Sequence, residues 1–221
     1  MRQSAIILAT LLVLAAGRDA ARADFVTDPA GDFLATYTGP KAGDLDVLTA
    51  GVTFDGTRFV LTATMNGAIG TTAGALYVWG VDRGAGTARF PTLAPGVTFD
   101  SVVSLQAVRD ATGALLGAGT VNLIVGGGST TLSASDVLIS GNTISATVLA
   151  SSLPTQGFTP SNYTFNLWPR FGTGNNNQIS DFAPDNSNLR AGAVPEPSSL
   201  ALCALAGLAG LGWRIGRRRP S

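Results

Sequence analysis

The sequence predicts an all-β fold and, within that class, an antiparallel β-sandwich of about eight strands. Three observations favour this class. Thr and Val are frequent, Gly, Asn and Asp recur at intervals of about 8 to 12 residues, and no long stretch has helical periodicity. Short strands with hairpin-length connections are typical of a sandwich, and a closed β-barrel is the alternative.

The first 23 residues have the features of a secretory signal peptide. Arg2 supplies a basic start, residues 5–17 are apolar, and the small residues Ala21 and Ala23 precede the expected cleavage point. A helix over 5–17 would reach only about 20 Å, whereas a bilayer core is roughly 30 Å thick. We therefore expect export through the Sec translocon and cleavage by signal peptidase after Ala23. A non-cleaved anchor is the alternative.

Residues 24–193 amount to about one domain by length. They contain twelve Asp, no Glu, one Lys and six Arg, which gives a net charge of −5. This balance excludes nucleic-acid binding, because a phosphate-reading domain needs a basic face. A domain of this length can fold without disulfides, and the single Cys of the chain, Cys203, lies outside it.

The clearest strand pair lies between residues 47 and 67. Apolar side chains alternate along both strands, at Leu48, Ala50, Val52 and Phe54 and then at Phe59, Leu61, Ala63 and Met65. Asp55-Gly56 between them is a strong signal for a tight hairpin. Further strands are predicted at 75–82, 97–108, 119–125, 131–140, 142–149 and 162–169, with a Gly141-Asn142 turn.

The chemistry of the domain is marked by absences. The chain has no His, which excludes Ser-His-Asp and Cys-His catalytic sets and any histidine metal ligand. The glycine-rich stretches at 80–86 and 125–130 lack the Lys of a phosphate-binding loop. We expect a protein that is not an enzyme. A hydrolase of extracellular polymer that works through Asp residues is the alternative.

Several Asp residues lie close together near the start of the domain, and Asp24 is the first of them. A calcium ion binds carboxylate and carbonyl oxygens, so the sequence suggests a Ca²⁺ site formed by Asp28, Asp32, Asp44 and Asp46. The alternative is that these residues form turns, because an Asp side chain can bond to its own backbone.

A second candidate site lies on the strand at 162–169. Asn166 and Trp168 share one face of this strand and Arg170 follows, as in a platform on which a sugar ring could stack. The alternative is that Trp168 covers the edge of the core. Trp79 has apolar neighbours on both sides, and we expect it to be buried.

Residues 28–90 resemble the opening of DOMON-like and family-9 carbohydrate-binding-module-like sandwiches of exported bacterial proteins. An acidic loop precedes the strands, and the matching positions are Asp44, Leu45, Asp55, Gly56, Tyr77, Gly80 and Asp82. The resemblance implies a binding module for a glycan, without catalysis.

The C-terminal segment 194–221 resembles the PEP-CTERM sorting domain. Val194, Pro195, Glu196 and Pro197 precede an apolar stretch over 198–215, and Arg214, Arg217, Arg218 and Arg219 lie at its end. The stretch reaches about 27 Å as a helix, so it predicts one transmembrane helix, with the arginines on the cytoplasmic side. The resemblance implies recognition by an exosortase-type protease.

Together these features predict an exported protein that is anchored in the inner membrane, faces the periplasm and is then processed. We expect its destination to be the cell surface or the extracellular matrix. Its expected role is a non-catalytic one that includes binding extracellular polysaccharide. A purely structural adhesin is a further alternative.

Overall fold

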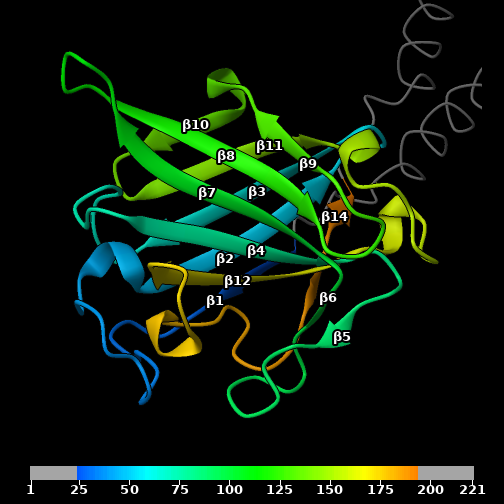
Figure 1. Ribbon diagram of the computed structural model, residues 1–221, viewed down its shortest axis with the longest axis horizontal. Coiled ribbons are helices and arrows are strands. Elements are labelled where there is room, and N and C mark those ends of the chain that lie inside the picture. Colours follow the sequence, from blue (N-terminus) through cyan, green and yellow to red (C-terminus); the bar gives the residue numbers. More distant parts are fainter. Residues whose placement is uncertain (1–23, 194–221) are drawn as a thin grey trace, which may run out of the picture. The chain divides into compact units, whose positions relative to one another are not determined.

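Two sheets form the domain in the computed structural model, which describes residues 24–193 (Figure 1). The all-β prediction is confirmed for this part of the chain, where the helices are short 3-10 turns. None of the helices in residues 24–193 is long and apolar enough to cross a membrane. The predicted signal peptide (1–23) and transmembrane helix (198–215) lie outside the described residues.

The first sheet has the strand order β1-β2-β3-β11-β10, and β14 pairs in parallel with β2. Its other strand pairs are antiparallel. The strands are β1 (Asp24–Thr27), β2 (Val47–Phe54), β3 (Arg58–Met65), β10 (Val137–Ser140), β11 (Thr143–Leu149) and β14 (Gly192–Ala193).

The second sheet has the order β13-β12-β4-β7-β8-β9 and is antiparallel. Its strands are β4 (Ala75–Asp82), β7 (Ser101–Arg109), β8 (Leu115–Leu123), β9 (Ser129–Leu132), β12 (Thr164–Phe171) and β13 (Leu189–Arg190). A small ribbon joins β5 (Thr87–Ala88) to β6 (Thr98–Phe99). The 3-10 turns are η1 (Gly43–Leu45), η2 (Ala134–Asp136), η3 (Ala150–Ser152), η4 (Pro160–Asn162) and η5 (Asn176–Gln178).

The main core lies between the two sheets. Alternate residues of β3 and β4 face it, and they are fully buried in both strands: Phe59, Leu61, Ala63 and Met65, and Tyr77, Trp79 and Val81. The predicted periodicity of β3 and the predicted burial of Trp79 are therefore confirmed. The two sheets remain open in the described part of the chain, so the alternative of a closed barrel is not realised.

The predicted hairpin at Asp55-Gly56 joins β2 to β3. Gly56 has a φ of +95°, a left-handed conformation that glycine adopts without strain. Asp55 stabilises the turn through its side chain, because its Oδ1 accepts hydrogen bonds from the N–H groups of Thr57 (2.8 Å) and Arg58 (2.7 Å). The second predicted turn is also present, with Gly141 at φ +60° between β10 and β11.

Two of the predicted strands are interrupted. The prediction of a single strand over 131–140 is wrong, because η2 separates β9 of the second sheet from β10 of the first. Ser133 and Asp136 form a capping box that closes this turn. The stretch 97–108 breaks at Asp100, whose carboxylate accepts hydrogen bonds from Arg83 rather than facing a neighbouring strand.

A second core lies on the outer face of the second sheet. Its buried residues come from β4, from β12 and from two connections, 83–100 and 172–188. We call these two connections the cover. They are Val78, Phe90, Ala94, Val97, Phe99, Trp168, Ile179 and Phe182. The second sheet is therefore packed on both of its faces around β4 and β12.

Candidate functional site

The structure brings four carboxylates together at one end of the domain. Asp28 and Asp32 lie between β1 and β2, and Asp181 and Asp185 follow β12 in the chain. One carboxylate oxygen from each lies within 4.8 Å of the others. We call this group the carboxylate cluster. Two of its members, Asp28 and Asp32, were predicted as metal ligands from the sequence.

Burial and mutual repulsion act on this cluster. Burial, reinforced by the charges of Asp181 and Asp32, raises the pKa of Asp28 well above its ordinary value. Burial also raises the pKa of Asp181, although the N–H groups of Val47 and Phe182 hydrogen-bond its carboxylate. Within the part of the chain that the structure describes, the buried Oδ2 of Asp28 has no hydrogen-bond partner. The cluster therefore holds excess negative charge that a proton or a cation would neutralise.

Asp44 and Asp46 are not part of the cluster, which corrects this half of the predicted metal site. The carboxylate of Asp44 accepts hydrogen bonds from the N–H (2.7 Å) and the hydroxyl (2.6 Å) of Thr72. Asp46 accepts from the N–H of Gly31 (2.9 Å) and from the side-chain amide of Asn66 (2.8 Å). Both carboxylates thus fix loops, and Asp46 holds the loop that carries the first half of the cluster.

Sequence reasoning missed Asp181 and Asp185, although a signal was present. The segments 28–32 and 181–185 read Asp-Pro-Ala-Gly-Asp and Asp-Phe-Ala-Pro-Asp, with the same spacing between their carboxylates. Pairing two such loops needs the tertiary fold, because about 150 residues separate them along the chain. Oxygen-only donors of this kind suit a hard cation such as Ca²⁺.

The predicted sugar platform is not assembled. The ring of Trp168 is only 2% exposed, because Phe90, Phe99 and Phe182 of the second core pack around it. The amide of Asn166 is fully buried and donates to the carbonyls of Pro184 and Ser187. This finding corrects the prediction, since no face of the indole is free to stack on a sugar.

Arg170, the third predicted residue of the platform, also has a local role. Its guanidinium donates to the carbonyl oxygens of Gly172 and Asn175 (2.9 Å for the latter), which closes the loop after β12. Burial lowers the pKa of this guanidinium somewhat. The residue supports the cover and does not face a ligand site.

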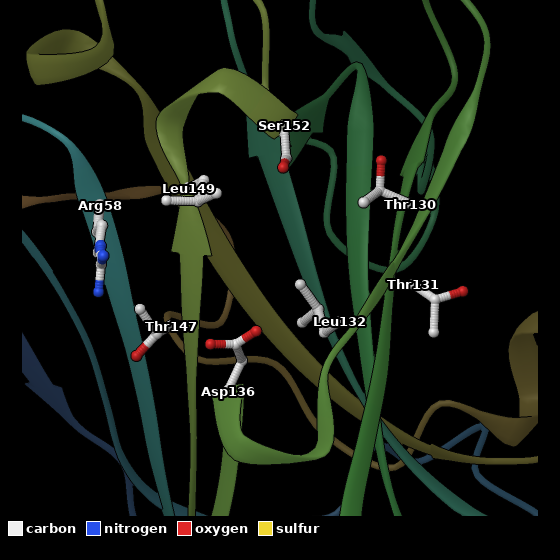
Figure 2. A pocket seen from close by; sticks show the side chains of 8 residues that line it. All are labelled: Arg58, Thr130, Thr131, Leu132, Asp136, Thr147, Leu149 and Ser152. Atoms are coloured by element: carbon white, nitrogen blue, oxygen red, sulfur yellow. The ribbon is translucent and has the colours of Figure 1, made fainter.

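A shallow hollow of about 200 Å³ lies where β11 and β9 approach each other. Arg58, Thr147 and Leu149 of the first sheet line one side, and Thr130 to Leu132 of β9 line the other. Figure 2 shows the side chains of Leu132 and Asp136 directed into the space between the two strands. Asp136 is its one acidic lining residue, and Ser133 hydrogen-bonds that carboxylate. The hollow could take a small polar group, but it lacks the two facing carboxylates that polymer hydrolysis requires.

The predicted sorting and processing residues lie outside the described residues. They are Ala21 and Ala23 at the expected cleavage point, Val194, Pro195, Glu196 and Pro197 of the motif, and Arg214, Arg217, Arg218 and Arg219. Their assignment thus depends on sequence, and the comparisons with known proteins bear on it.

No curated protein matches this chain, and no solved structure matches it. The resemblance of residues 28–90 to DOMON-like and carbohydrate-binding sandwiches therefore stays a prediction. In contrast, residues 193–219 match the model of the PEP-CTERM protein-sorting motif. This confirms the resemblance of the C-terminal segment to the PEP-CTERM sorting motif, and it indicates a protein that is exported and sorted to the cell envelope by an exosortase-type system.

Proposed function

We propose that this protein is a non-catalytic component of the cell surface or extracellular matrix, and that it binds polysaccharide there. The observation that carries the proposal is the sorting-motif match at residues 193–219, which begins at Ala193, the last residue of β14. In this proposal the signal peptide directs export, and the apolar stretch 198–215 holds the chain in the inner membrane, facing the periplasm. Processing at the motif then releases the domain to its destination.

Fractionation of cells that make the full chain tests this delivery route. A variant with Pro195, Glu196 and Pro197 changed to Ala should accumulate at the inner membrane in a longer form, whereas the wild type should be shortened. Pro220→Ala is the matched control, because it changes a proline beyond the apolar stretch. Wild-type chain that stays in the cytosol with both ends intact would rule out the proposed route.

Two features of the domain argue against hydrolysis in the hollow. The hollow between β9 and β11 has one acidic lining residue, and the carboxylate cluster lies elsewhere. An Asp-dependent hydrolase and a purely structural adhesin are the competing functions. Incubation of the full chain with extracellular polymer should release no new reducing ends, while the polymer should retain the protein on sedimentation. Release of ends would favour the hydrolase, and no retention would favour the adhesin.

We also propose that the carboxylate cluster binds Ca²⁺ and thereby stabilises the domain. The buried, unpartnered Oδ2 of Asp28 supports this, as does the fact that the neighbouring charges acting on Asp28 are all carboxylates. At a Ca²⁺ concentration of 100 times Kd, the gain is about 2.7 kcal/mol, or a rise in Tm of about 5–10 °C. Asp32→Asn with Asp185→Asn should abolish the difference between Ca²⁺ and EDTA, and Asp110→Asn is the control. An unchanged Tm of the wild type in EDTA would contradict the site.

A further inference from the structure

The outer face of the first sheet carries rows of hydroxyl groups. The register of the strands aligns one residue from each of five strands across the sheet. One row consists of Thr27, Thr49, Thr64, Thr143 and Ser140. Neighbouring strands lie about 4.7–4.9 Å apart, so this row presents hydroxyls at a regular interval. We call this surface the hydroxyl face.

The adjacent row places an aromatic ring beside further hydroxyls. It runs from Phe25 through Gly51, Thr62 and Ser145 to Leu138. The Phe25 ring lies over Gly51, where any side chain would collide with it. The ring is 51% exposed, so its other side faces solvent. An aromatic ring packed on a glycine offers a firm apolar surface next to polar groups.

The hydroxyl face is almost free of charge. Among the outward-facing residues of β2, β3, β10 and β11, Arg58 at the end of β3 is the charged one, although the domain carries a net charge of −5. The hydroxyls of Thr64 and Thr143 lie 3.3 Å apart. Within residues 24–193, no side-chain hydrogen bond is found for Thr62 or Ser145. These hydroxyls remain available to an external partner.

This combination favours one kind of partner. The cores of protein interfaces are rich in large aromatic side chains and Arg and poor in Ser. This face has one aromatic ring and one Arg, and its exposed aliphatic side chains, Val60, Leu138 and Leu149, stand among Thr and Ser. An anionic polymer or lipid surface would need more than one basic residue. An uncharged polysaccharide offers hydroxyls for the rows and C–H groups for the Phe25 ring, and its repeat gives it successive equivalent contacts along a row.

A third row connects the hydroxyl face to the hollow. Thr53, Val60 and Thr147 are aligned across β2, β3 and β11, and Thr147 also lines the hollow with Arg58. The surface thus extends from Phe25 at the β1 edge to the hollow beside β9. It gives an extended polymer contacts across the whole sheet.

We infer that the hydroxyl face is the polysaccharide-binding surface, and that its ligand is an uncharged, extended glycan whose sugar rings stack on Phe25. The inference rests on the proposed function and names its surface and ligand class. Hydrogen bonds from the Thr and Ser rows hold the chain across the strands. The covered face of the second sheet takes no part.

Sedimentation with insoluble polymers tests this inference on the full chain in mild detergent. The probes are cellulose, curdlan, mannan and starch as uncharged glycans, and calcium alginate as an anionic one. At least one uncharged probe should retain the protein more strongly than alginate does. Phe25→Leu, which keeps an apolar contact with Gly51 but lacks a flat ring, should weaken that binding about tenfold, while Phe25→Trp should retain it.

Thr62→Glu provides a second test, because it places a charge in the middle of the hydroxyl face. We expect a loss of about tenfold or more, and no loss for Gln106→Glu, which places the same charge on the second sheet. Equal melting temperatures would show that the variants fold. Retention by none of the uncharged probes, or binding unaffected by both Phe25→Leu and Thr62→Glu, would overturn the inference. Delivery to the envelope would stand in either case, because fractionation tests it separately.

Discussion

Each sheet carries an aromatic ring over a glycine on its outer face, and the two rings have opposite fates. Phe25 lies over Gly51 on the first sheet and is 51% exposed. Trp168 lies over Gly80 on the second sheet and is 2% exposed. The local arrangement is similar, so the strands themselves do not decide which ring can meet a ligand.

The connections between strands make the difference. On the first sheet, tight hairpins join β2 to β3 and β10 to β11. The long connection 28–46 between β1 and β2 packs through Leu34 against the two cores rather than over Phe25. On the second sheet, the long connections 83–100 and 172–188 fold back over β4 and β12 and bury Trp168. An aromatic residue on a strand is therefore a ligand platform only where no connection folds over it.

The largest expected effect on stability follows from removing the buried ion pair that fixes the cover. Arg83 follows β4, Asp100 precedes β7, and their side chains form a 2.7 Å salt bridge with no exposure to solvent. The same guanidinium donates to the carbonyls of Pro154 and Val125. Arg83→Met should lower the free energy of unfolding by about 3–5 kcal/mol, because Asp100 keeps a buried charge and loses its positively charged partner. Urea denaturation measures this.

Arg89→Met is the control for that experiment. Arg89 also belongs to the cover, but it makes a single hydrogen bond to the carbonyl of Phe99 (3.2 Å). Its loss should cost about 1 kcal/mol or less. If the two variants were equally stable, the buried pair would not be what holds the cover in place.

A smaller change should loosen the cover and leave the first sheet intact. Phe90 contacts Phe99, Trp168 and Phe182 in the second core. Phe90→Leu should cost about 1–2 kcal/mol, since it leaves part of that space unfilled. Hydrogen exchange should become faster at Ala94 and Val97, whose N–H groups bond within the cover. Equal acceleration in β3 and β11 would mean that the two faces are not independent.

Much of the fold could be predicted from the sequence because it depends on local pattern. The alternation in β3, the bounds of β4 and both hairpin turns follow from side-chain periodicity and from glycine. The break between β9 and β10 was missed, since a run of small polar residues reads as one strand. The cover was missed as well, because its apolar residues lie in connections without periodicity.

The candidate sites were predictable only in part, for the same reason. Asp28 and Asp32 are neighbours in the chain, and the sequence identified them. Their partners Asp181 and Asp185 come from a distant loop. Trp168 was more conspicuous than Phe25, but whether a ring is exposed depends on long-range packing that no local pattern encodes.

The carboxylate cluster should make stability depend on pH in the opposite way to ordinary surface carboxylates. Burial raises the pKa of Asp28 and Asp181 in the folded state, so the folded state binds more protons than the unfolded state above pH 4. In EDTA, the free energy of unfolding should fall as pH rises from 5 to 8. We expect a change on the order of 1 kcal/mol, because solvent screens the half-buried Asp28.

Asp28→Asn should reduce this pH dependence, since its side chain cannot ionise, while burial still raises the pKa of Asp181. Asp110→Asn should not, because hydrogen bonds from Thr112 lower the pKa of Asp110 and place its titration below this window. Thermal unfolding at pH 5 and pH 8 provides the comparison. A wild-type protein that is more stable at pH 8 in EDTA would contradict the repulsion within the cluster.

The smallest expected effect on stability comes from removing a hydroxyl that has no hydrogen bond within the domain, in comparison with one that has such a bond. Thr62 lies on the hydroxyl face without a side-chain hydrogen bond in the described residues, so Thr62→Val should change the free energy of unfolding by less than about 0.5 kcal/mol. Thr98 belongs to the cover, where its hydroxyl donates to Asp82 (2.8 Å), and Thr98→Val should cost about 1–2 kcal/mol. Binding should show the reverse order, with a loss of about fivefold for Thr62→Val alone, as expected for one hydrogen bond. If Thr62→Val were the more destabilising of the two, the hydroxyl rows would be part of the fold, and the contrast between an open and a covered face would fail.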